Sequence, residues 1–156
     1  MAKEELTPMQ RQYQEMKARN KDCILFFRLG DFYEMFNEDA MLAARELDLT
    51  LTTRDRSKPK EEQTPMCGVP YHSVDAYIAR MVQKGYKVAV CEQMQDPKEV
   101  KGLVERDITR IVTPGTVTES CMLDENKNNY MACVYGENHR YGMAFCDVST
   151  GAFYAT

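Results

Sequence analysis

The sequence lacks any long hydrophobic run. No apolar stretch approaches the length of about 18 residues that a transmembrane helix needs, and the N-terminus has no apolar segment like that of a secretory signal. Both absences favour a cytoplasmic protein. Leucine, isoleucine, valine and phenylalanine are also sparse, at roughly a fifth of the 156 residues. Because 11 methionines and 9 tyrosines add apolar volume and the net charge is only −4, we still expect a folded, soluble chain.

Enzyme and metal signatures are missing too. The chain has no GxxxxGK[ST] phosphate-binding loop, no GxGxxG dinucleotide motif and no GxSxG nucleophile motif. Its six cysteines are scattered without a CxxC pair and its two histidines are far apart in sequence, so reduced thiols are favoured over disulfides or a zinc site. The acidic balance argues against a protein that coats nucleic acid by bulk charge, but it leaves room for a local basic patch.

What the chain does contain is an alternation of helix and strand patterns. Thr7, Pro8 and Gln10 predict the capped start of a helix that runs to about residue 20, and the apolar run 23–27 is typical of a central strand. The next patterns predict a turn at 28–31, an extended or tightly turning segment at 32–36, a helix over about 38–47 capped by Asn37, and a strand at 49–53. A polar loop at 54–66 and a further loop at 66–72 follow, and then a helix capped by Ser73 and ended by Gly85. The last patterns predict a strand at 86–91, a charged loop at 97–107 and a strand at 108–112.

This order of elements indicates an α/β domain with a mixed sheet flanked by helices over residues 1–116. Residues 117–129 have the composition of a polar linker. A second domain is expected to begin at residue 130, with strands at 130–135, at 141–148 and from 153 onward, separated by turns. Because the chain stops within the last strand, we expect residues 130–156 to be the truncated start of that domain.

The segment Phe32-Tyr33-Glu34 is the first candidate for function. In an extended segment, residues i and i+2 project to the same side, so Phe32 and Glu34 would emerge together. An aromatic ring can push between base steps from the minor groove and kink the duplex, and weakly paired steps cost least to unstack. The simpler alternative places Phe32 in the core and Glu34 in solvent.

The carboxylate of Glu34 at first argues against DNA binding, because a negative charge near phosphates weakens binding to any duplex. It is compatible with DNA where a base offers a free N–H donor, or where the acid takes up a proton and donates it to a base nitrogen. A mispaired base can supply such a partner, whereas a Watson–Crick pair mostly cannot. Glu34 would then sharpen discrimination by penalising correctly paired DNA.

Two enzymatic alternatives stay open from the residues alone. Asp31, Asp39 and Glu92 could gather around Mg²⁺ as in a metal nuclease, although no lysine follows Glu92 two residues later. Cys67 and His72 could form a nucleophile pair, although no third residue orients the histidine and His72 is more typical of a structural hydrogen bond. Gly68, in the same segment, would let a ligand approach the backbone closely.

Several longer motifs resemble the N-terminus of the bacterial MutS DNA mismatch-repair family. They are TPM at residues 7–9, FRLGDFYEMF at 27–36, LTLT at 49–52, PMCGVPYH at 65–72, CEQ at 91–93, DP at 96–97, VER at 104–106 and RIVTPGT at 110–116. Together they cover nearly all of residues 7–118 in family order and spacing. Residues 130–156 resemble the opening strands of the RNase H-like connector domain of that family.

The resemblance implies a mismatch-recognition domain that reads DNA from the minor groove. It assigns the wedge to Phe32 and the hydrogen bond to a base to Glu34, and it places Arg54, Met66 and Arg106 at positions that approach the DNA backbone or groove. It implies no catalysis and no cofactor in this segment. For a full-length protein it implies a homodimer, ATP and Mg²⁺ in a downstream ATPase domain, a MutL-type partner and a cytoplasmic, nucleoid-associated location. A family member that binds branched or undamaged DNA and a protein-interaction domain remain as alternatives.

Overall fold

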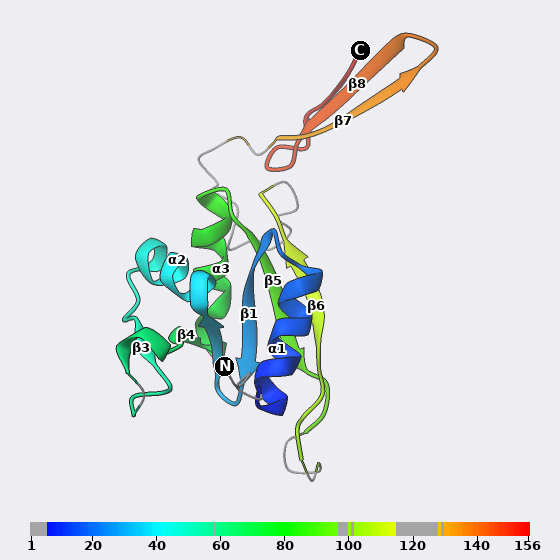
Figure 1. Cartoon of the computed structure of the whole chain (residues 1–156). Coiled ribbons are helices and arrows are strands. Elements are labelled where there is room, and N and C mark those ends of the chain that lie inside the picture. The colour runs from blue at the N-terminus through cyan, green and yellow to red at the C-terminus, as the bar shows by residue number, and fades with distance from the viewer. Residues whose placement is uncertain (1–5, 58, 97–99, 101, 115–127, 129) are drawn as a thin grey trace. The chain divides into compact units, whose positions relative to one another are not determined.

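The computed structural model describes residues 6–57, 59–96, 100, 102–114, 128 and 130–156 (Figure 1). The chain divides into two compact units, residues 1–114 and residues 115–156, and each is described by itself. The expected linker at 117–129 lies outside the described residues, apart from residue 128. No helix in the part of the chain that the structure describes is long and apolar enough to cross a membrane.

The first unit is built on a six-stranded mixed sheet with the strand order β3-β4-β2-β1-β5-β6. All neighbouring strands are antiparallel except β1 and β5, which run parallel and lie at the centre of the sheet. The strands are β1 (Cys23–Leu29), β2 (Phe32–Phe36), β3 (Thr52–Thr53), β4 (Pro65–Pro70), β5 (Lys87–Gln93) and β6 (Arg106–Val112). The predicted α/β class with a mixed sheet is therefore confirmed.

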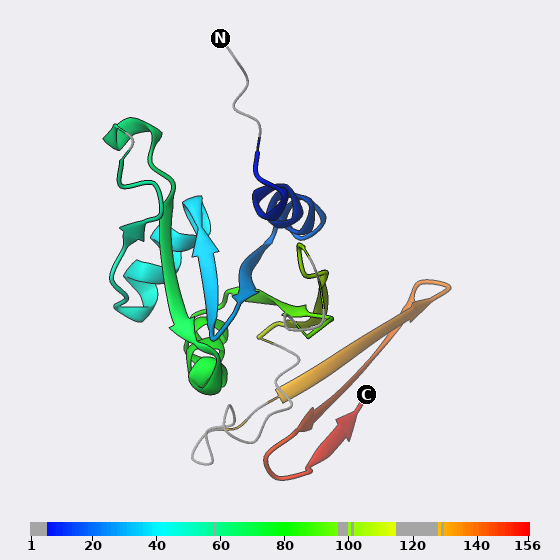
Figure 2. The ribbon, with the colours of Figure 1, turned by 90° about the horizontal axis from the view of Figure 1, so that it is seen from below.

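Helices cover both faces of this sheet. Helix α1 (Pro8–Arg19) packs on one face, which we call the α1 face, and α2 (Asn37–Leu47) and α3 (Val74–Gln83) pack on the other, as Figures 1 and 2 show. Because successive side chains of a strand alternate between faces, a strand covered on both sides must be apolar throughout. The first five residues of β1 are all buried, which confirms the expected central strand.

The predicted helix boundaries are confirmed in most places. Thr7 caps α1 with a reciprocal capping box to Gln10, and Pro8 occupies the first turn. Gly85, two residues after the end of α3, stops the helix as predicted. Its φ of 91° allows its N–H to bond Val82 O at 2.9 Å while Tyr86 N–H bonds Met81 O at 3.1 Å. These bonds satisfy carbonyls that the end of the helix would otherwise leave unpaired.

Two predicted caps are wrong. Asn37 is the first residue of α2, with a φ of 54°, and the N-cap position belongs to Phe36, so Asn37 is one residue too late to cap. Ser73 does stand at the N-cap of α3, but its hydroxyl donates to Pro70 O at 3.3 Å and makes no capping bond. The short 3₁₀ turn at Tyr71–Ser73 carries the chain into α3 instead.

The segment between α2 and α3 also differs from the prediction. The expected strand at 49–53 shrinks to Thr52–Thr53, since Leu49 N–H bonds Ala44 O at 2.9 Å and is tied to the end of α2. The expected loop at 66–72 is the full strand β4, which pairs with β2 on one side and β3 on the other. Within the polar loop, residues Lys60–Glu62 form one 3₁₀ turn.

The second unit is an antiparallel meander of the strands β7 (Tyr130–Glu137), β8 (Arg140–Asp147) and β9 (Phe153–Ala155). Asn138 and His139 both adopt positive φ values, 47° and 62°, as a tight hairpin turn between β7 and β8 requires. The three predicted strands are confirmed, and the first of them extends two residues further than expected, to Glu137.

Candidate nucleic-acid interface

The predicted wedge lies beside the turn that joins β1 to β2, at the lower end of the sheet in Figure 1. Only Gly30 and Asp31 separate the two strands, and Gly30 takes a φ of 58° that favours glycine. Phe32 follows directly and keeps 47% of its surface exposed, whereas the next residue, Tyr33, keeps 3%. The alternative that places Phe32 in the core is therefore wrong.

Strand registers place a row of residues on the α1 face next to Phe32. Glu34 lies opposite Gly68, and Phe36 lies opposite Met66. Directly opposed residues of an antiparallel pair share one face, so Phe32, Glu34, Met66 and Gly68 lie together. We call these four residues the Phe32 surface. Helix α1 covers β1 and β6 and leaves all four at least partly exposed.

Gly68 sets how closely the side chains of β2 can approach β4. A Cβ atom at this position would lie 3.2 Å from Tyr33 O, 3.5 Å from Glu34 Cγ and 3.7 Å from Phe32 Cδ1. The side chains of Phe32 and Glu34 therefore both lean over the glycine, which confirms that they emerge on one side. In the structure, these two side chains approach the Gly68 backbone. The close approach of a ligand to Gly68 stays a prediction.

Glu34 is the one acid of this surface. Its Oε2 atom is buried and is the one buried side-chain oxygen or nitrogen of the described residues that has no hydrogen-bond partner. Burial raises the pKa of the Glu34 carboxyl, and the positive charge of Arg54 opposes that rise only in part. The acid thus carries unused hydrogen-bonding capacity and binds a proton more readily than a solvated glutamate does.

Arg54 and Met66, which the family resemblance places at the DNA, both lie near Glu34. Arg54 is exposed in the loop that follows β3 and is close enough to influence the charge of Glu34. Met66 is half-buried and packs against the core under α1. Arg54 offers an exposed positive charge, and Met66 extends the apolar part of the Phe32 surface.

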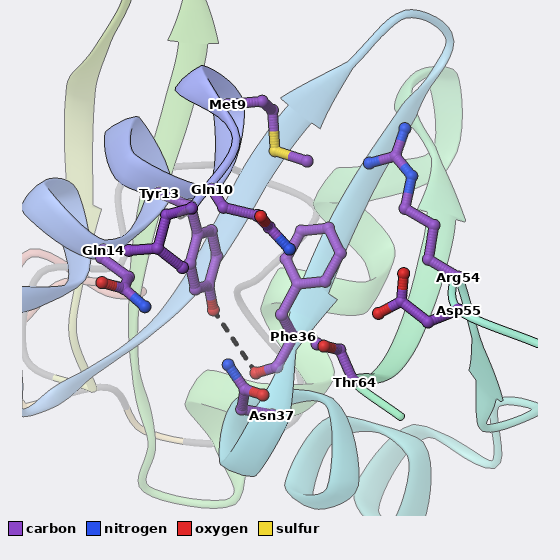
Figure 3. A pocket seen from close by; sticks show the side chains of 10 residues that line it. Met9, Gln10, Tyr13, Gln14, Phe36, Asn37, Arg54, Asp55 and Thr64 are labelled. Carbon is purple, nitrogen blue, oxygen red and sulfur yellow. Dashed lines mark hydrogen bonds between the residues drawn. The ribbon is translucent and has the colours of Figure 1, made fainter. Parts of the chain in front are cut away.

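A small pocket of about 150 Å³ adjoins this surface (Figure 3). Tyr13 and Phe36 form its floor with ring centroids 4.9 Å apart, and the Tyr13 hydroxyl donates to Phe36 O at 3.4 Å. In Figure 3 the Phe36 ring lies between Tyr13 and Arg54, so the pocket links α1 to the loop that carries Arg54. The pocket wall holds no cluster of nucleophilic or metal-ligating side chains among the described residues.

Arg106 does not join this interface. It is only 6% exposed, and its guanidinium donates to Arg28 O at 2.7 Å, Gln12 Oε1 at 2.9 Å and Val104 O at 2.9 Å. The guanidinium also lies over the Phe27 ring, 5.1 Å from its centroid, and burial lowers the pKa of Arg106. The structure therefore favours an internal, structural role for Arg106 over the expected contact with DNA.

The carboxylates of the nuclease alternative are not brought together. Asp39 lies in α2 and accepts from Lys17 Nζ at 2.8 Å and from Leu25 N at 3.0 Å. Glu92 lies in β5 and accepts from the Tyr33 hydroxyl. No group of three possible metal ligands occurs within the ranges that the structure describes. The arrangement thus offers no site for the metal that this alternative needs.

The cysteine alternative fails on burial. Cys67 is 1% exposed, its Sγ contacts Ala40 O at 3.4 Å, and burial raises the pKa of its thiol to about 11. His72 is exposed and lies after β4. A protonated, enclosed thiol is a poor nucleophile. The described cysteines are all free, with Cys23, Cys67 and Cys91 buried, while Cys121 lies outside the described residues.

Comparison with known proteins agrees with this geometry. The family described as MutS domain I matches residues 7–121, which is most of the chain and includes the whole of the six-stranded sheet. The chain belongs to the MutS family through this domain.

Relatives make the assignment specific. The chain is 61% identical over 151 residues to the DNA mismatch repair protein MutS of Acetivibrio thermocellus and 61% identical to that of Ruminiclostridium cellulolyticum. It is 60% identical to that of Clostridium novyi. These matches cover 97% of the chain but only 17% of the first two relatives and 16% of the third.

Proposed function

We propose that this chain recognises mismatched or unpaired bases in duplex DNA and thereby serves DNA mismatch repair. Its membership of the MutS family supports this function, as does the description of its relatives as DNA mismatch repair proteins. The single structural observation that carries the proposal is Phe32, an aromatic ring held half-exposed directly after a two-residue turn. The ring does not stand alone, because half-buried Met66 lies on the same face of β2 and β4, and the two form one apolar surface beside Glu34.

Phe32 would act as a wedge in the minor groove. Inserting an aromatic ring between base steps costs the unstacking of those steps, on the order of a few kcal/mol, and the cost is lowest where pairing is already faulty. The ring therefore selects steps that unstack easily without reading base identity. The half-exposed Met66, beside Glu34 and Gly68 on the Phe32 surface, adds apolar contact next to the kink.

Glu34 would examine the displaced base. Its buried, unpaired Oε2 needs a donor, and the unpaired edge of a mismatched base supplies one. The raised pKa also makes the second route accessible, in which the acid binds a proton and donates it to a base nitrogen. Correctly paired DNA mostly cannot supply such a partner, and there the carboxylate remains as a repulsive charge close to phosphate.

Arg54 would contact the phosphate backbone. It is exposed and lies on the same side of the sheet as the Phe32 surface, next to the pocket under α1. Its side chain offsets the charge of Glu34 in the free protein and can turn to a phosphate in the complex. The acidic chain as a whole gains little from bulk charge, so such local contacts decide its affinity.

The wider activities belong to a protein of the length of the MutS relatives, of which this chain spans 17%. We infer that such a protein acts as a homodimer, binds ATP and Mg²⁺ in an ATPase domain outside residues 1–156, and passes its signal to a MutL-type partner. Residues 130–156 would begin the connector domain. In this view the described chain contributes recognition and no catalysis.

The test compares binding to a duplex with one G·T mismatch against the matched G·C duplex. The proteins are the chain itself and a chimera in which it replaces the matching segment of the Acetivibrio thermocellus protein. We expect Phe32→Ala to reduce the mismatch preference of the chimera at least tenfold, toward a ratio of one, because the kink loses its wedge.

Phe153→Ala is the matched control, since Phe153 is 68% exposed but lies in the second unit. This control should keep the preference. A Phe32→Ala protein that still prefers G·T as strongly as the parent would refute the proposal.

A further inference from the structure

A second group of side chains lies on the opposite face of the sheet and contacts the turn that precedes Phe32. Arg28, near the end of β1, donates from Nε to Gly30 O within the turn. Its guanidinium lies over the Tyr71 ring, 4.1 Å from the centroid, and 5.3 Å from that of Tyr33. Arg28 therefore joins the turn to two aromatic rings.

Tyr71 holds the other side of the same turn. It directly follows β4, and its backbone N–H donates to Asp31 O at 2.9 Å. Both carbonyls of the two-residue turn are thus bonded, one by Arg28 and one by Tyr71. A turn fixed in this way has few conformations left.

Acidic Glu92 completes the group from β5. It accepts from the Tyr33 hydroxyl, and its Oε2 lies 3.9 Å from a terminal nitrogen of Arg28. The Arg28 side chain is only 18% exposed, so its charge is directed into this cluster and away from solvent. We call Arg28, Tyr33, Tyr71 and Glu92 the turn cluster.

A wedge works only if its base is rigid. Unstacking a base step costs about a few kcal/mol. If the turn were loose, folding the ring back along the protein would cost less than opening the base stack, and the stack would stay closed. Phe32 itself has few contacts to prevent this, because nearly half of its surface is exposed. The resistance must come from the turn, and the turn is held by Arg28 and Tyr71.

We propose that Arg28 and Tyr71 are positioning residues that brace the Phe32 turn and so determine mismatch discrimination without touching DNA. This inference rests on the proposed wedge role of Phe32. It assigns a role to the turn cluster, which takes no part in the proposed contacts with the mismatch. Arg28 acts by its planar guanidinium, which stacks and donates from Nε in a fixed geometry that lysine cannot reproduce.

The test uses the chimera with the G·T and G·C duplexes over a series of salt concentrations. Tyr71→Ala and Arg28→Lys should each lower the mismatch preference at least fivefold, with little change in affinity for matched duplex or in its salt dependence. Both Tyr71 variants retain the backbone N–H that bonds Asp31 O, so Tyr71→Ala removes only the ring under the Arg28 guanidinium. Tyr71→Phe retains that ring and should keep the preference. Thermal unfolding of the 156-residue chain shows which variants remain folded. If Arg28→Lys does not fold, Tyr71→Ala alone tests the proposal.

The outcomes separate the brace from the wedge. If Phe32→Ala loses the preference while folded Tyr71→Ala and Arg28→Lys keep it, the brace is refuted and the wedge stands. If Phe32→Ala keeps the preference, the wedge itself fails. If Arg28→Lys binds like the parent but Arg28→Met lowers the salt dependence for both duplexes, Arg28 is a phosphate contact and the brace is again refuted.

Discussion

At the scale of the residue, the chemistry of the Phe32 surface comes from one strained acid. Glu34 lies over Gly68 with a buried oxygen that has no hydrogen-bond partner among the described residues. The positive charge of Arg54 offsets only part of the cost of burying the carboxylate. The buried carboxylate lowers the stability of the free protein and leaves one oxygen able to accept a hydrogen bond from a ligand. Such unsatisfied groups in a native protein usually mark function.

The raised pKa of Glu34 predicts a pH-dependent gain from Glu34→Gln. An acid whose pKa is higher in the folded state destabilises the fold once the pH rises above its unfolded pKa of about 4.3, and the penalty is complete above the folded pKa. Glu34→Gln should therefore raise the free energy of unfolding at pH 7, with the difference disappearing near pH 4.

Urea unfolding of the chain at several pH values measures this, with exposed Glu15→Gln as the control. A Glu34→Gln chain that is less stable than the parent at pH 7 would show that Glu34 has a partner in the free protein.

The two arginines expected at the DNA show how far residue patterns can be trusted. Alternation along β2 was enough to predict that Phe32 and Glu34 share a side. The burial of Arg106 could not be predicted, because its acceptors come from Gln12, Arg28 and Val104, two of which are distant in sequence. An arginine in a charged stretch has the same local pattern whether it faces phosphate or the interior.

Arg106→Ala and Arg54→Ala should therefore differ in kind. Removing the buried guanidinium leaves two carbonyls and one amide oxygen without their donor, at a cost of about 2–3 kcal/mol in the free energy of unfolding. Removing the exposed Arg54 should lower stability only slightly, by the part of the Glu34 charge that it offsets, and should lower the salt dependence of duplex binding by about one unit of slope. Denaturant unfolding and salt titrations check both, and equal stability of the two variants would contradict the assignment.

At the scale of the element, α1, β1 and α2 are joined at one buried carboxylate. Asp39 accepts from Lys17 of α1 and from the backbone of Leu25 in β1, where β2 has already diverged and offers no partner. Lys17 also donates to Cys23 O at 2.6 Å. The cluster fixes the helix on the α1 face relative to the helix on the other.

Asp39→Ala should destabilise the chain by about 2–4 kcal/mol, because it leaves the buried N–H of Leu25 without its acceptor and Lys17 without its counter-charge. The control is Asp22→Ala, which breaks an ion pair of the same 2.8 Å length between exposed side chains and should change stability little. Denaturant unfolding compares the two. Equal losses would show that the burial of Asp39 does not matter.

Elements with strong local signals could be predicted, and those set by pairing could not. The capping box of α1, the apolar run of β1 and the glycine that ends α3 all carry their cause in a few adjacent residues. Strand β4 begins and ends in proline and contains Gly68, a composition typical of a loop. It is a strand because β2 and β3 pair with it from both sides, which no local pattern contains.

At the scale of the whole molecule, the helices leave one part of the sheet open for the proposed recognition. Helices α2 and α3 cover one face, whereas on the other face α1 packs over β1, β5, β6 and the Phe36 end of β2. The remaining part of that face carries Phe32 and Glu34, and the turn cluster supports their turn from behind. A single hairpin therefore connects a rigid interior to an exposed ring.

The most direct test of this account follows the base stack itself. The fluorescence of 2-aminopurine placed beside a G·T mismatch rises when its stacking is broken. We predict that the chimera raises this fluorescence on the mismatched duplex and far less on the matched one, and that Phe32→Ala abolishes the rise at saturating protein while Phe153→Ala preserves it. A rise that persists in saturated Phe32→Ala would contradict the claim that this ring opens the stack.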